Sequence, residues 1–349
     1  MALEFDLIER YFFPLSQGFD SVEIGIGDDG AVLNVPEQHQ LVVVTDTLVA
    51  GVHFPVKTLA YDIAWKALAV NLSDLAAMGA TPACYSLALT LPSYDARWLQ
   101  DFSRGLRDLS TQFKIPLVGG DTTKGPLTIT ITAQGWVPNQ QAVLRSGAQE
   151  GDFICVTNTL GEGALGLKLA LAADKERVLP FLSKQEQECA LNALNRPMPQ
   201  LAISLDLRGL ANSAIDISDG LLADLAHMLK HSSKAFLKPE RGGKDLNSSS
   251  STAVLGAEIE LTQLPLSSGV LRYIEQTNDW TLPLSGGDDY QLCVTVSPKN
   301  RAKLMERLSA KGVSLSVIGK VVMNDLGIRC LKQGVVHNIG GGEKGYRHF

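Results

Sequence analysis

The sequence predicts an α/β protein of mixed α+β character, with two domains. Short apolar runs typical of strands alternate along the chain with longer segments of helical period. The chain has 349 residues, enough for two domains with separate cores. Turn residues cluster near 138–152, and a new strand-like run follows them. We therefore expect an N-terminal domain over residues 1–147 and a C-terminal domain over residues 148–349.

The first predicted elements are a strand and a long helix. The apolar run at 41–44 predicts a strand, with the segment 45–47 (Thr-Asp-Thr) at its C-terminal end. Apolar residues at helical spacing predict a helix over 61–78, which the glycine that follows would end. Asn71 and Asp74 are three residues apart on this helix and therefore share a face.

The rest of the N-terminal half predicts a second helix and two more strands. Either Ser93 or Asp95 caps the helix, which carries apolar residues as far as position 113. A short strand at 115–118 leads into Gly-Gly-Asp, and the alternation over 128–132 predicts a strand with one buried face.

The C-terminal half begins with a strand predicted over 153–157, followed by Gly161, Gly163 and Gly166. This glycine spacing is similar to that of a dinucleotide-binding loop, but a lone glycine pattern is weak evidence and a tight strand-to-helix turn is the simpler interpretation. Residues 238–252 are polar and rich in Gly and Ser, which predicts a mobile surface excursion. Further along, alternation and apolar runs predict a helix over 221–230 and strands over 255–261 and 291–296.

Composition excludes several classes of function. The formal net charge is −6, whereas a surface for nucleic acid or an anionic membrane needs a basic patch. No apolar stretch approaches the roughly 20 residues of a membrane span, and the acidic start of the chain is unlike a signal peptide. The 5 cysteines are scattered and form no CxxC, which indicates reduced thiols. We expect a cytoplasmic protein that binds neither nucleic acid nor membrane.

Five short segments combine aspartates with Gly, Ser, Thr or Asn. They are 25–29 (Gly-Ile-Gly-Asp-Asp), 45–47 (Thr-Asp-Thr), 71–74 (Asn-Leu-Ser-Asp), 119–123 (Gly-Gly-Asp-Thr-Thr) and 216–220 (Asp-Ile-Ser-Asp-Gly). Carboxylates and hydroxyls are the hard oxygen ligands that Mg²⁺ prefers, and glycine lets backbone approach closely. For any one aspartate a turn or helix cap is the simpler interpretation. The set taken together favours one metal site assembled from several loops.

Clustered aspartates suit phosphoryl transfer, because the metal ions they bind neutralise the polyanions that must meet. The chain has no GxxxxGK[ST] loop and no protein-kinase signature, so an enzyme of this sequence would use ATP by another design. Arg145 is the candidate cation for a phosphate group. His53 is balanced between core packing and substrate contact.

In this order, the segments resemble those of the thiamine-monophosphate kinase family, in the aminoimidazole-ribonucleotide-synthetase-like superfamily. The similarity extends from about residue 5 to the end of the chain and includes the segments 71–79, 145–148, 285–290 and 345–349. The resemblance implies two α/β domains and a homodimer paired through the sheets of its N-terminal domains. It also implies Mg²⁺-assisted transfer of the ATP γ-phosphoryl group to thiamine monophosphate, which gives thiamine diphosphate and ADP. A sibling enzyme with another substrate, and a nucleotide-binding relative without turnover, are the alternatives.

The resemblance assigns roles to particular residues. The implied Mg²⁺ ligands, for several ions, are Asp29, Thr45, Asp46, Asp74, Asp121, Asp216 and Asp219. The implied nucleotide contacts are Gly120, Asp121, Arg145 and Ser218, and the implied substrate contacts are His53, Asp288 and Tyr346. Asp121, Arg145 and Asp219 are the implied catalytic residues. Asp288 stands where the family usually has Glu, and Arg347 where it often has an acidic residue, so both bear on the substrate side of the site.

Overall fold

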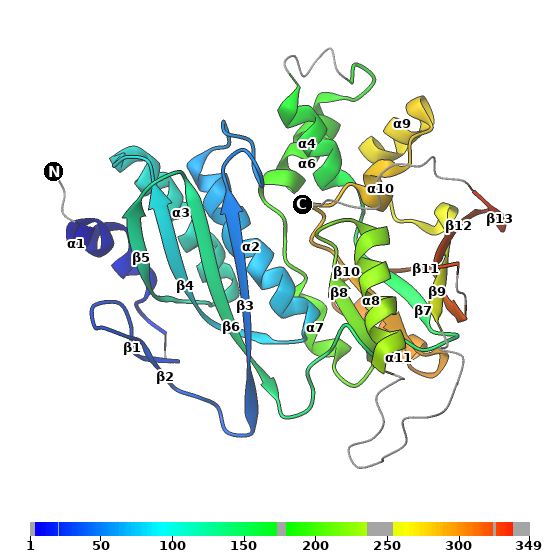
Figure 1. Ribbon diagram of the computed structural model, residues 1–349, viewed down its shortest axis with the longest axis horizontal. Helices are drawn as coiled ribbons and strands as arrows, with labels where there is room; N and C mark the ends of the chain where they lie inside the picture. The colour runs from blue at the N-terminus through cyan, green and yellow to red at the C-terminus, as the bar shows by residue number, and fades with distance from the viewer. Residues whose placement is uncertain (1–3, 20, 173–178, 236–253, 324–325, 338–349) are drawn as a thin grey trace, which may run out of the picture. The chain divides into compact units, whose positions relative to one another are not determined.

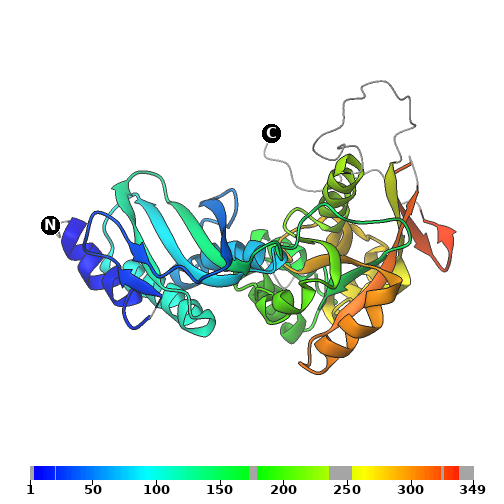
Figure 2. The ribbon, with the colours of Figure 1, turned by 90° about the horizontal axis from the view of Figure 1, so that it is seen from below.

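The computed structural model describes residues 4–19, 21–172, 179–235, 254–323 and 326–337 (Figures 1 and 2). The chain forms two compact units. Unit 1 comprises Met1–Ala142, Ala170–Ala173 and Asn195–Leu201, and unit 2 comprises Val143–Leu169, Asp174–Leu194 and Ala202–Phe349. The mixture of helix and sheet confirms the predicted fold class. The boundary between residues 147 and 148 stays a prediction, and the excursion predicted over 238–252 lies outside the described residues.

Unit 1 is built on a four-stranded sheet of order β3-β6-β4-β5, in which only β4 and β5 are parallel. Its elements are α1 (Glu4–Leu7), η1 (Ile8–Phe12), η2 (Phe13–Leu15), β1 (Val22–Ile24), β2 (Val32–Leu33), β3 (His39–Val49), α2 (Ala60–Ala77), β4 (Thr81–Leu91), α3 (Ala96–Phe113), β5 (Leu117–Lys124) and β6 (Thr128–Pro138). Both α2 and α3 lie on the same side of this sheet (Figures 1 and 2). The opposite face of the sheet carries neither helix.

The predicted helices and the alternating strand of unit 1 are confirmed. The helix expected over 61–78 is α2, and Asp95 rather than Ser93 caps α3, since its side chain accepts hydrogen bonds from the N–H groups of the next turn. In β6, Ile129 and Ile131 are buried while the threonines beside them are partly exposed, as the alternation predicts.

Strands β3 and β5 are longer than predicted, and this moves two acidic segments out of loops. Strand β3 pairs with β6 along its whole length, so Asp46 and its two threonines lie inside the strand. The hydroxyl of Thr45 lies 3.0 Å from that of Thr132, and the next threonine pair repeats this contact at 2.9 Å. β-Branched side chains favour such pairing. Asp121 likewise lies inside β5. The expectation that these residues occupy loops was wrong.

A seven-stranded sheet of order β13-β12-β9-β11-β7-β10-β8 forms the centre of unit 2 in the described part of the chain. The elements after β6 are β7 (Phe153–Thr157), α4 (Glu162–Leu171), α6 (Lys184–Asn195), α7 (Leu201–Leu207), β8 (Ala211–Asp216), α8 (Leu221–Ala235), β9 (Leu255–Glu260), η3 (Leu261–Gln263), α9 (Ser268–Thr277), α10 (Thr281–Ser285), β10 (Leu292–Val296), α11 (Pro298–Ser309), β11 (Leu315–Met323), β12 (Ile328–Lys332) and β13 (Val335–Val336). One apolar core joins the central strands to α4, α6, α8, α9 and α10.

The glycines after β7 are explained by packing. A Cβ atom at Gly163 would lie 2.1 Å from the carbonyl oxygen of Asp288, and one at Gly166 would lie 2.1 Å from that of Ala190. Gly161 has a φ of +86°, which favours glycine. The tight-turn interpretation accounts for Gly161, and close contact of helix α4 with neighbouring backbone accounts for Gly163 and Gly166.

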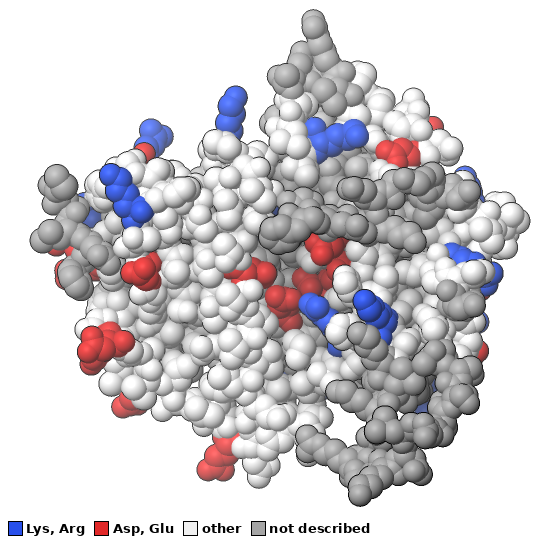
Figure 3. Space-filling view, viewed as in Figure 1, with Lys and Arg blue, Asp and Glu red and all other residues white. Residues whose placement is uncertain are grey.

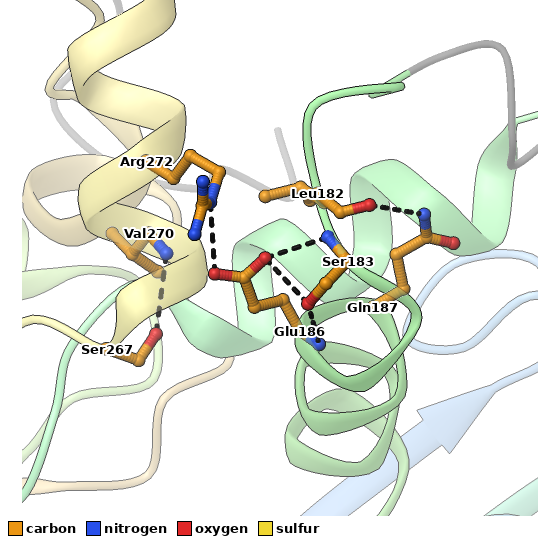
Figure 4. Close-up of polar contacts among 7 residues, drawn as sticks. All are labelled: Leu182, Ser183, Glu186, Gln187, Ser267, Val270 and Arg272. Carbon is orange, nitrogen blue, oxygen red and sulfur yellow. Dashed lines mark hydrogen bonds and ion pairs between the residues drawn. The ribbon is translucent and has the colours of Figure 1, made fainter.

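Helix α6 begins in a capping box that also ties it to α9 (Figure 4). Ser183 and Glu186 exchange hydrogen bonds: the backbone N–H of Ser183 donates to Glu186 Oε2 at 2.8 Å, and the N–H of Glu186 donates to Ser183 Oγ at 3.2 Å. The remaining oxygen of Glu186 accepts from Nε of Arg272 in α9, at 3.1 Å. The box fixes the start of α6 against the core of unit 2.

Residues Asn195–Leu201 return the chain to unit 1, where Arg196 is held by two neighbouring residues of α2. Its Nε donates to Oδ1 of Asp62 at 2.5 Å, and its guanidinium lies 4.7 Å from the ring centroid of Tyr61. The indole N–H of Trp65 donates to the carbonyl oxygen of Pro197 at 3.0 Å. Asp62 is buried, so Arg196 supplies the charge that compensates it.

Candidate active site

The first group of predicted ligands in unit 1 is a pair of carboxyl groups. Asp46 lies in β3 opposite buried Ile131, on the face of the sheet that α2 covers. Its side chain is hydrogen-bonded to that of Asp74, near the C-terminal end of α2. Burial raises the pKa of Asp46, while the contact with Asp74 lowers it. Two carboxyl groups in contact must share either a proton or a cation, so this pair is suited to bind Mg²⁺.

Asp121 lies on the other face of the same sheet. Asp121 pairs with Ala88 of β4, Ala88 with Thr130 of β6, and Thr130 with Thr47 of β3. Paired residues share a face, and Thr47 follows Asp46 directly, so Asp121 and Asp46 point to opposite faces. Strands β3 and β5 are the two edges of the sheet, three strand spacings or about 14 Å apart. Thr45 and Asp121 of one chain are therefore too far apart to bind the same ion, since each oxygen must lie about 2.0–2.6 Å from the metal.

Asp121 lines a pocket of about 670 Å³ in unit 1. The glycine-rich segment 26–31, which includes Asp28 and Asp29, forms one wall, and residues 119–122 of β5 form another. Ile8, Phe12 and Leu117 contribute apolar surface. Asp29 and Asp121, predicted from separate motifs, thus line one concave surface. Gly119 and Gly120 line it as well, and there only the backbone faces the pocket because glycine has no side chain. Such a surface can accept a phosphate-bearing ligand with its metal ions.

His53 lies in the turn after β3, and its side chain is partly buried. The N–H of Val49 donates to His53 Nδ1 at 3.0 Å, so the neutral ring carries its proton on Nε2. The carbonyl oxygen of His53 accepts from Nζ of buried Lys66, at 3.4 Å. These contacts fix the ring orientation.

In unit 2 the predicted ligands Asp216 and Asp219 lie at the junction of β8 and α8. Asp216 is the last residue of β8 and is buried, while Ser218 and Asp219 form the turn that leads into α8. Asp224, in the first turn of α8, accepts hydrogen bonds at Oδ2 from the N–H groups of residues 218, 219 and 220, at 3.1, 3.0 and 3.1 Å. Burial, together with the charges of Asp216 and Asp219, raises the pKa of Asp224 to about 7.

A second loop, 286–291, is bonded to this turn. The N–H of Asp288 donates to the carbonyl oxygen of Ser218 at 2.9 Å, and the N–H of Tyr290 donates to that of Ile217 at 2.8 Å. Asp288 and Tyr290 have φ values of 60° and 48°, a conformation that costs such residues about 1–3 kcal/mol each. The hydroxyl of Tyr290 donates to Asp288 Oδ1 at 3.1 Å. The predicted substrate residue Asp288 is therefore held in a strained loop beside Ser218.

Asp289 closes the same loop onto α4. The N–H of Gly161 donates to both carboxyl oxygens at 2.9 Å. The pKa of Asp289 is raised to about 8, because burial raises it by more than the backbone donors of Gly161 and Gly163 lower it. Asp289 is itself buried and anchors the loop that carries Asp288.

The side chain of Arg145 is exposed, and its backbone is anchored in unit 2. The N–H of Ala214 in β8 donates to the carbonyl oxygen of Leu144 at 3.0 Å. Two N–H groups on the other side of Arg145, those of Gly147 and Ala148, donate to Oγ of Ser232 at 3.1 and 3.0 Å. Arg145 is thereby held beside the strand that ends in Asp216.

Among the described residues, no three His, Cys, Asp or Glu side chains gather closely enough to ligate one ion. In unit 1 Asp46 and Asp74 lie on one face of the sheet, and Thr45 and Asp121 lie apart from each other on the other face. Asp216 and Asp219 lie together in unit 2. Tyr346 lies outside the described residues. Asp28, Asp224, Asp289 and Tyr290 were not predicted. Asp28 lies within the acidic segment 25–29, and Asp289 and Tyr290 lie within the family segment 285–290, although none of them was given a role. The signal for Asp224 was a carboxylate in the first turn of a predicted helix directly after an acidic motif.

Two family models match this chain. The model for the N-terminal domain of AIR synthase related proteins matches residues 27–137, and the model for their C-terminal domain matches residues 149–329. The chain is therefore an AIR synthase related protein with both domains of that class.

Relatives within this class define the family more closely. The thiamine-monophosphate kinase of Escherichia coli (strain K12) is 42% identical over 346 residues, 99% of this chain and 98% of the relative. The crystal structure of thiamine-monophosphate kinase from Stenotrophomonas maltophilia K279a is 38% identical and covers 91% of this chain and 93% of its own, with a TM-score of 0.76. The complex of AaThiL with AMPPCP and TMP is 27% identical, covers 100% and 99%, and has a TM-score of 0.72. This chain belongs to the thiamine-monophosphate kinase family, which confirms the resemblance seen in the sequence.

Proposed function

We propose that this chain transfers the γ-phosphoryl group of ATP to thiamine monophosphate, giving thiamine diphosphate and ADP. The identity of 42% to a thiamine-monophosphate kinase along nearly the whole chain carries this proposal. The related AaThiL binds AMPPCP and TMP, which supports ATP and thiamine monophosphate as the two substrates. The acceptor oxygen belongs to a phosphate and is already ionised, so positioning and charge neutralisation, rather than a strong base, would give the acceleration.

The residues present fit several Mg²⁺ ions. In unit 1 the Asp46–Asp74 pair, and the pocket that Asp29 and Asp121 line, offer carboxylate oxygens. In unit 2 Asp216 and Asp219 lie close enough to Asp224 to raise its pKa, a repulsion that a bound cation would offset. Thr45 is proposed as a further ligand. When bound, Mg²⁺ would neutralise phosphate oxygens and hold them for transfer.

Contacts with the two substrates are divided among the remaining predicted residues. Gly120, Asp121, Arg145 and Ser218 are proposed to bind the nucleotide, and His53, Asp288 and Tyr346 the thiamine substrate. Asp121, Arg145 and Asp219 would act on the transferring group itself. The contact between the N–H of Val49 and Nδ1 of His53 orients the ring, and the anchored loop at Asp288 supplies a carboxylate, which suits a substrate with a cationic thiazolium ring.

A product assay tests the proposed function. Purified protein is incubated with Mg²⁺-ATP and thiamine monophosphate, with free thiamine as a parallel acceptor, and the products are separated by chromatography. We expect thiamine diphosphate from the monophosphate alone, in equal amount to ADP. Binding of ATP without this product would contradict the proposal and favour a sibling enzyme with another substrate.

Arg145→Ala is expected to raise the KM for ATP by about tenfold to 100-fold, because a hydrogen bond to a charged group contributes about 1.5–3 kcal/mol. The guanidinium is exposed, so the free energy of unfolding should change little. Steady-state kinetics at varied ATP measure the effect. Arg307→Ala, also an exposed arginine of unit 2, is the control. An unchanged KM for ATP in Arg145→Ala would remove this residue from the nucleotide site.

A homodimer paired through the sheets of unit 1 is also part of the proposal. The face of the sheet away from α2 and α3 exposes Leu41 and Val43 of β3, 49% and 53% accessible, beside rows of threonines from β3 and β6. The described surface over β3, β6 and β4 is largely uncharged (Figure 3). An uncharged sheet face with exposed Leu and Val side chains is typical of a surface that a second copy covers.

Val43→Lys is expected to convert the dimer to a monomer, since each copy would place an ammonium group in the apolar interface. Sedimentation velocity measures the change in mass. Leu171→Lys, at a residue 68% exposed in α4, is the control and should remain dimeric. A Val43→Lys protein that stays dimeric would place the interface elsewhere.

A cytoplasmic location is the remaining part of the proposal. In the part of the chain that the structure describes, no helix is long and apolar enough to cross a membrane. All 5 cysteines are free, and Cys84, Cys155, Cys293 and Cys330 are buried. Free buried thiols suit a reducing compartment that also supplies ATP.

A further inference from the structure

Asp224 is a buried carboxylate that the proposed function does not use as a ligand. Its exposed fraction is 4%, and it lies one turn into α8, directly after the loop that carries Asp216, Ser218 and Asp219. A carboxylate removed from water needs strong partners, and here backbone N–H groups supply them.

Three consecutive N–H groups converge on a single oxygen, Oδ2 of Asp224. They belong to Ser218, Asp219 and Gly220, at 3.1, 3.0 and 3.1 Å. N–H groups of successive residues can meet at one point only when the backbone between them is tightly curved. Asp224 therefore selects the curvature of the ligand loop, and a hydrogen bond to each residue resists any change of its φ and ψ.

Neighbouring backbone excludes other conformations of the same turn. Gly220 has a φ of +117°, and a Cβ atom there would lie 2.8 Å from the carbonyl carbon of Ser285. A Cβ atom at Gly287 would lie 2.6 Å from the carbonyl oxygen of Ser218. The loop at 218–220 is thus held from inside by Asp224 and from outside by the loop at 285–288. Removing the carboxylate of Asp224 would leave three N–H groups without their acceptor. The surrounding backbone leaves too little space for the loop to rearrange without losing other contacts.

We propose that Asp224 is a positioning residue, which fixes the 216–220 loop so that Asp216, Ser218 and Asp219 present their oxygens together to a bound divalent cation and the nucleotide phosphates. Oδ2 of Asp224 is saturated by three donors, so we assign this carboxylate to the loop rather than to the ion. This inference rests on the proposed function for the identity of the phosphate ligand. The binding of a divalent cation by the loop can be measured without any substrate.

Binding of Mn²⁺, as a probe for Mg²⁺, tests the proposal by electron paramagnetic resonance on the full chain without nucleotide. Asp224→Asn keeps the size of the side chain but lowers the negative charge that attracts the three N–H groups. We expect Mn²⁺ affinity at one class of site to fall at least tenfold, with the number of bound ions at saturation unchanged. Asp219→Asn, which removes a proposed ligand, should instead lower the number of bound ions.

Asp152→Asn is the matched control for a purely structural effect. Asp152 is also buried in unit 2 and also accepts several hydrogen bonds, from the N–H of Gln149 at 2.9 Å and from Nδ2 of Asn212 at 2.9 Å. Its replacement should lower the melting temperature as much as Asp224→Asn and leave Mn²⁺ affinity within twofold of wild type. If Asp224→Asn does not fold, Asp224→Glu, which keeps the charge and shifts it by one methylene, should show a smaller loss of affinity.

Wild-type Mn²⁺ affinity in a folded Asp224→Asn or Asp224→Glu protein would overturn the inference, as would loss of a bound ion in either. Equal weakening in Asp152→Asn would also overturn it. The product assay tests the proposed function separately. If replacing Asp224 lowers Mn²⁺ affinity but the wild-type protein makes no thiamine diphosphate, this inference stands and the assigned substrate is wrong.

Discussion

Asp121→Asn is expected to lower kcat by about 10²–10³-fold, the loss seen when one preorganised charge-stabilising group is removed from an active site. Asp121 lines the same pocket as Asp29, and the substitution removes the charge of its side chain while keeping its shape. Asp121 is exposed in β5, so the melting temperature should stay within a few degrees of wild type. Measuring kcat at saturating ATP and thiamine monophosphate, together with thermal unfolding, gives both quantities.

The control for this experiment lies two residues further along the same strand. Thr123 is exposed on the same face of β5, and Thr123→Asn should leave kcat within about twofold of wild type. Near-wild-type turnover in Asp121→Asn would withdraw Asp121 from the set of metal and nucleotide ligands. A large loss of stability would show instead that the carboxylate supports the fold.

Gly120→Ala is expected to destabilise unit 1 by about 3 kcal/mol or more, at the upper end for overpacking. Its Cβ atom would lie 1.9 Å from the carbonyl oxygen of Leu87 in the paired strand β4, so β4 and β5 would have to separate. The next residue provides the control, because a Cβ atom at Gly119 meets nothing within 4 Å. Thermal unfolding should show a melting temperature lower by roughly 6–12 °C for Gly120→Ala and nearly unchanged for Gly119→Ala. Equal melting temperatures would mean that the strands adapt without cost.

Local patterns predicted most of the secondary structure because each depends on a short stretch of chain. The period of α2, the cap at Asp95 and the alternation in β6 are visible within a few turns or residues. The extension of β3 through Asp46 was missed because it depends on pairing with β6, about 85 residues later.

The candidate site was predicted as a list of residues but not as an arrangement. Motif order and resemblance named Asp46, Asp74 and Asp121, yet strand parity places Asp46 and Asp121 on opposite faces of one sheet. No motif states which face a residue takes, since a shift of one residue in register reverses it. The role of Asp224 was missed for a related reason: its partners are backbone N–H groups, which every sequence contains.

The return of Asn195–Leu201 to unit 1 has a consequence for the order of events during synthesis on the ribosome. Unit 1 is otherwise complete at Ala142, apart from Ala170–Ala173, but Asp62 gains Arg196 only after more than fifty further residues have been made. Until then Asp62 of α2 lacks the cation that compensates its charge in the folded chain. Unit 1 therefore gains this ion pair only after part of unit 2 has been synthesised. The two halves of the polypeptide are coupled in their maturation even though each forms its own core.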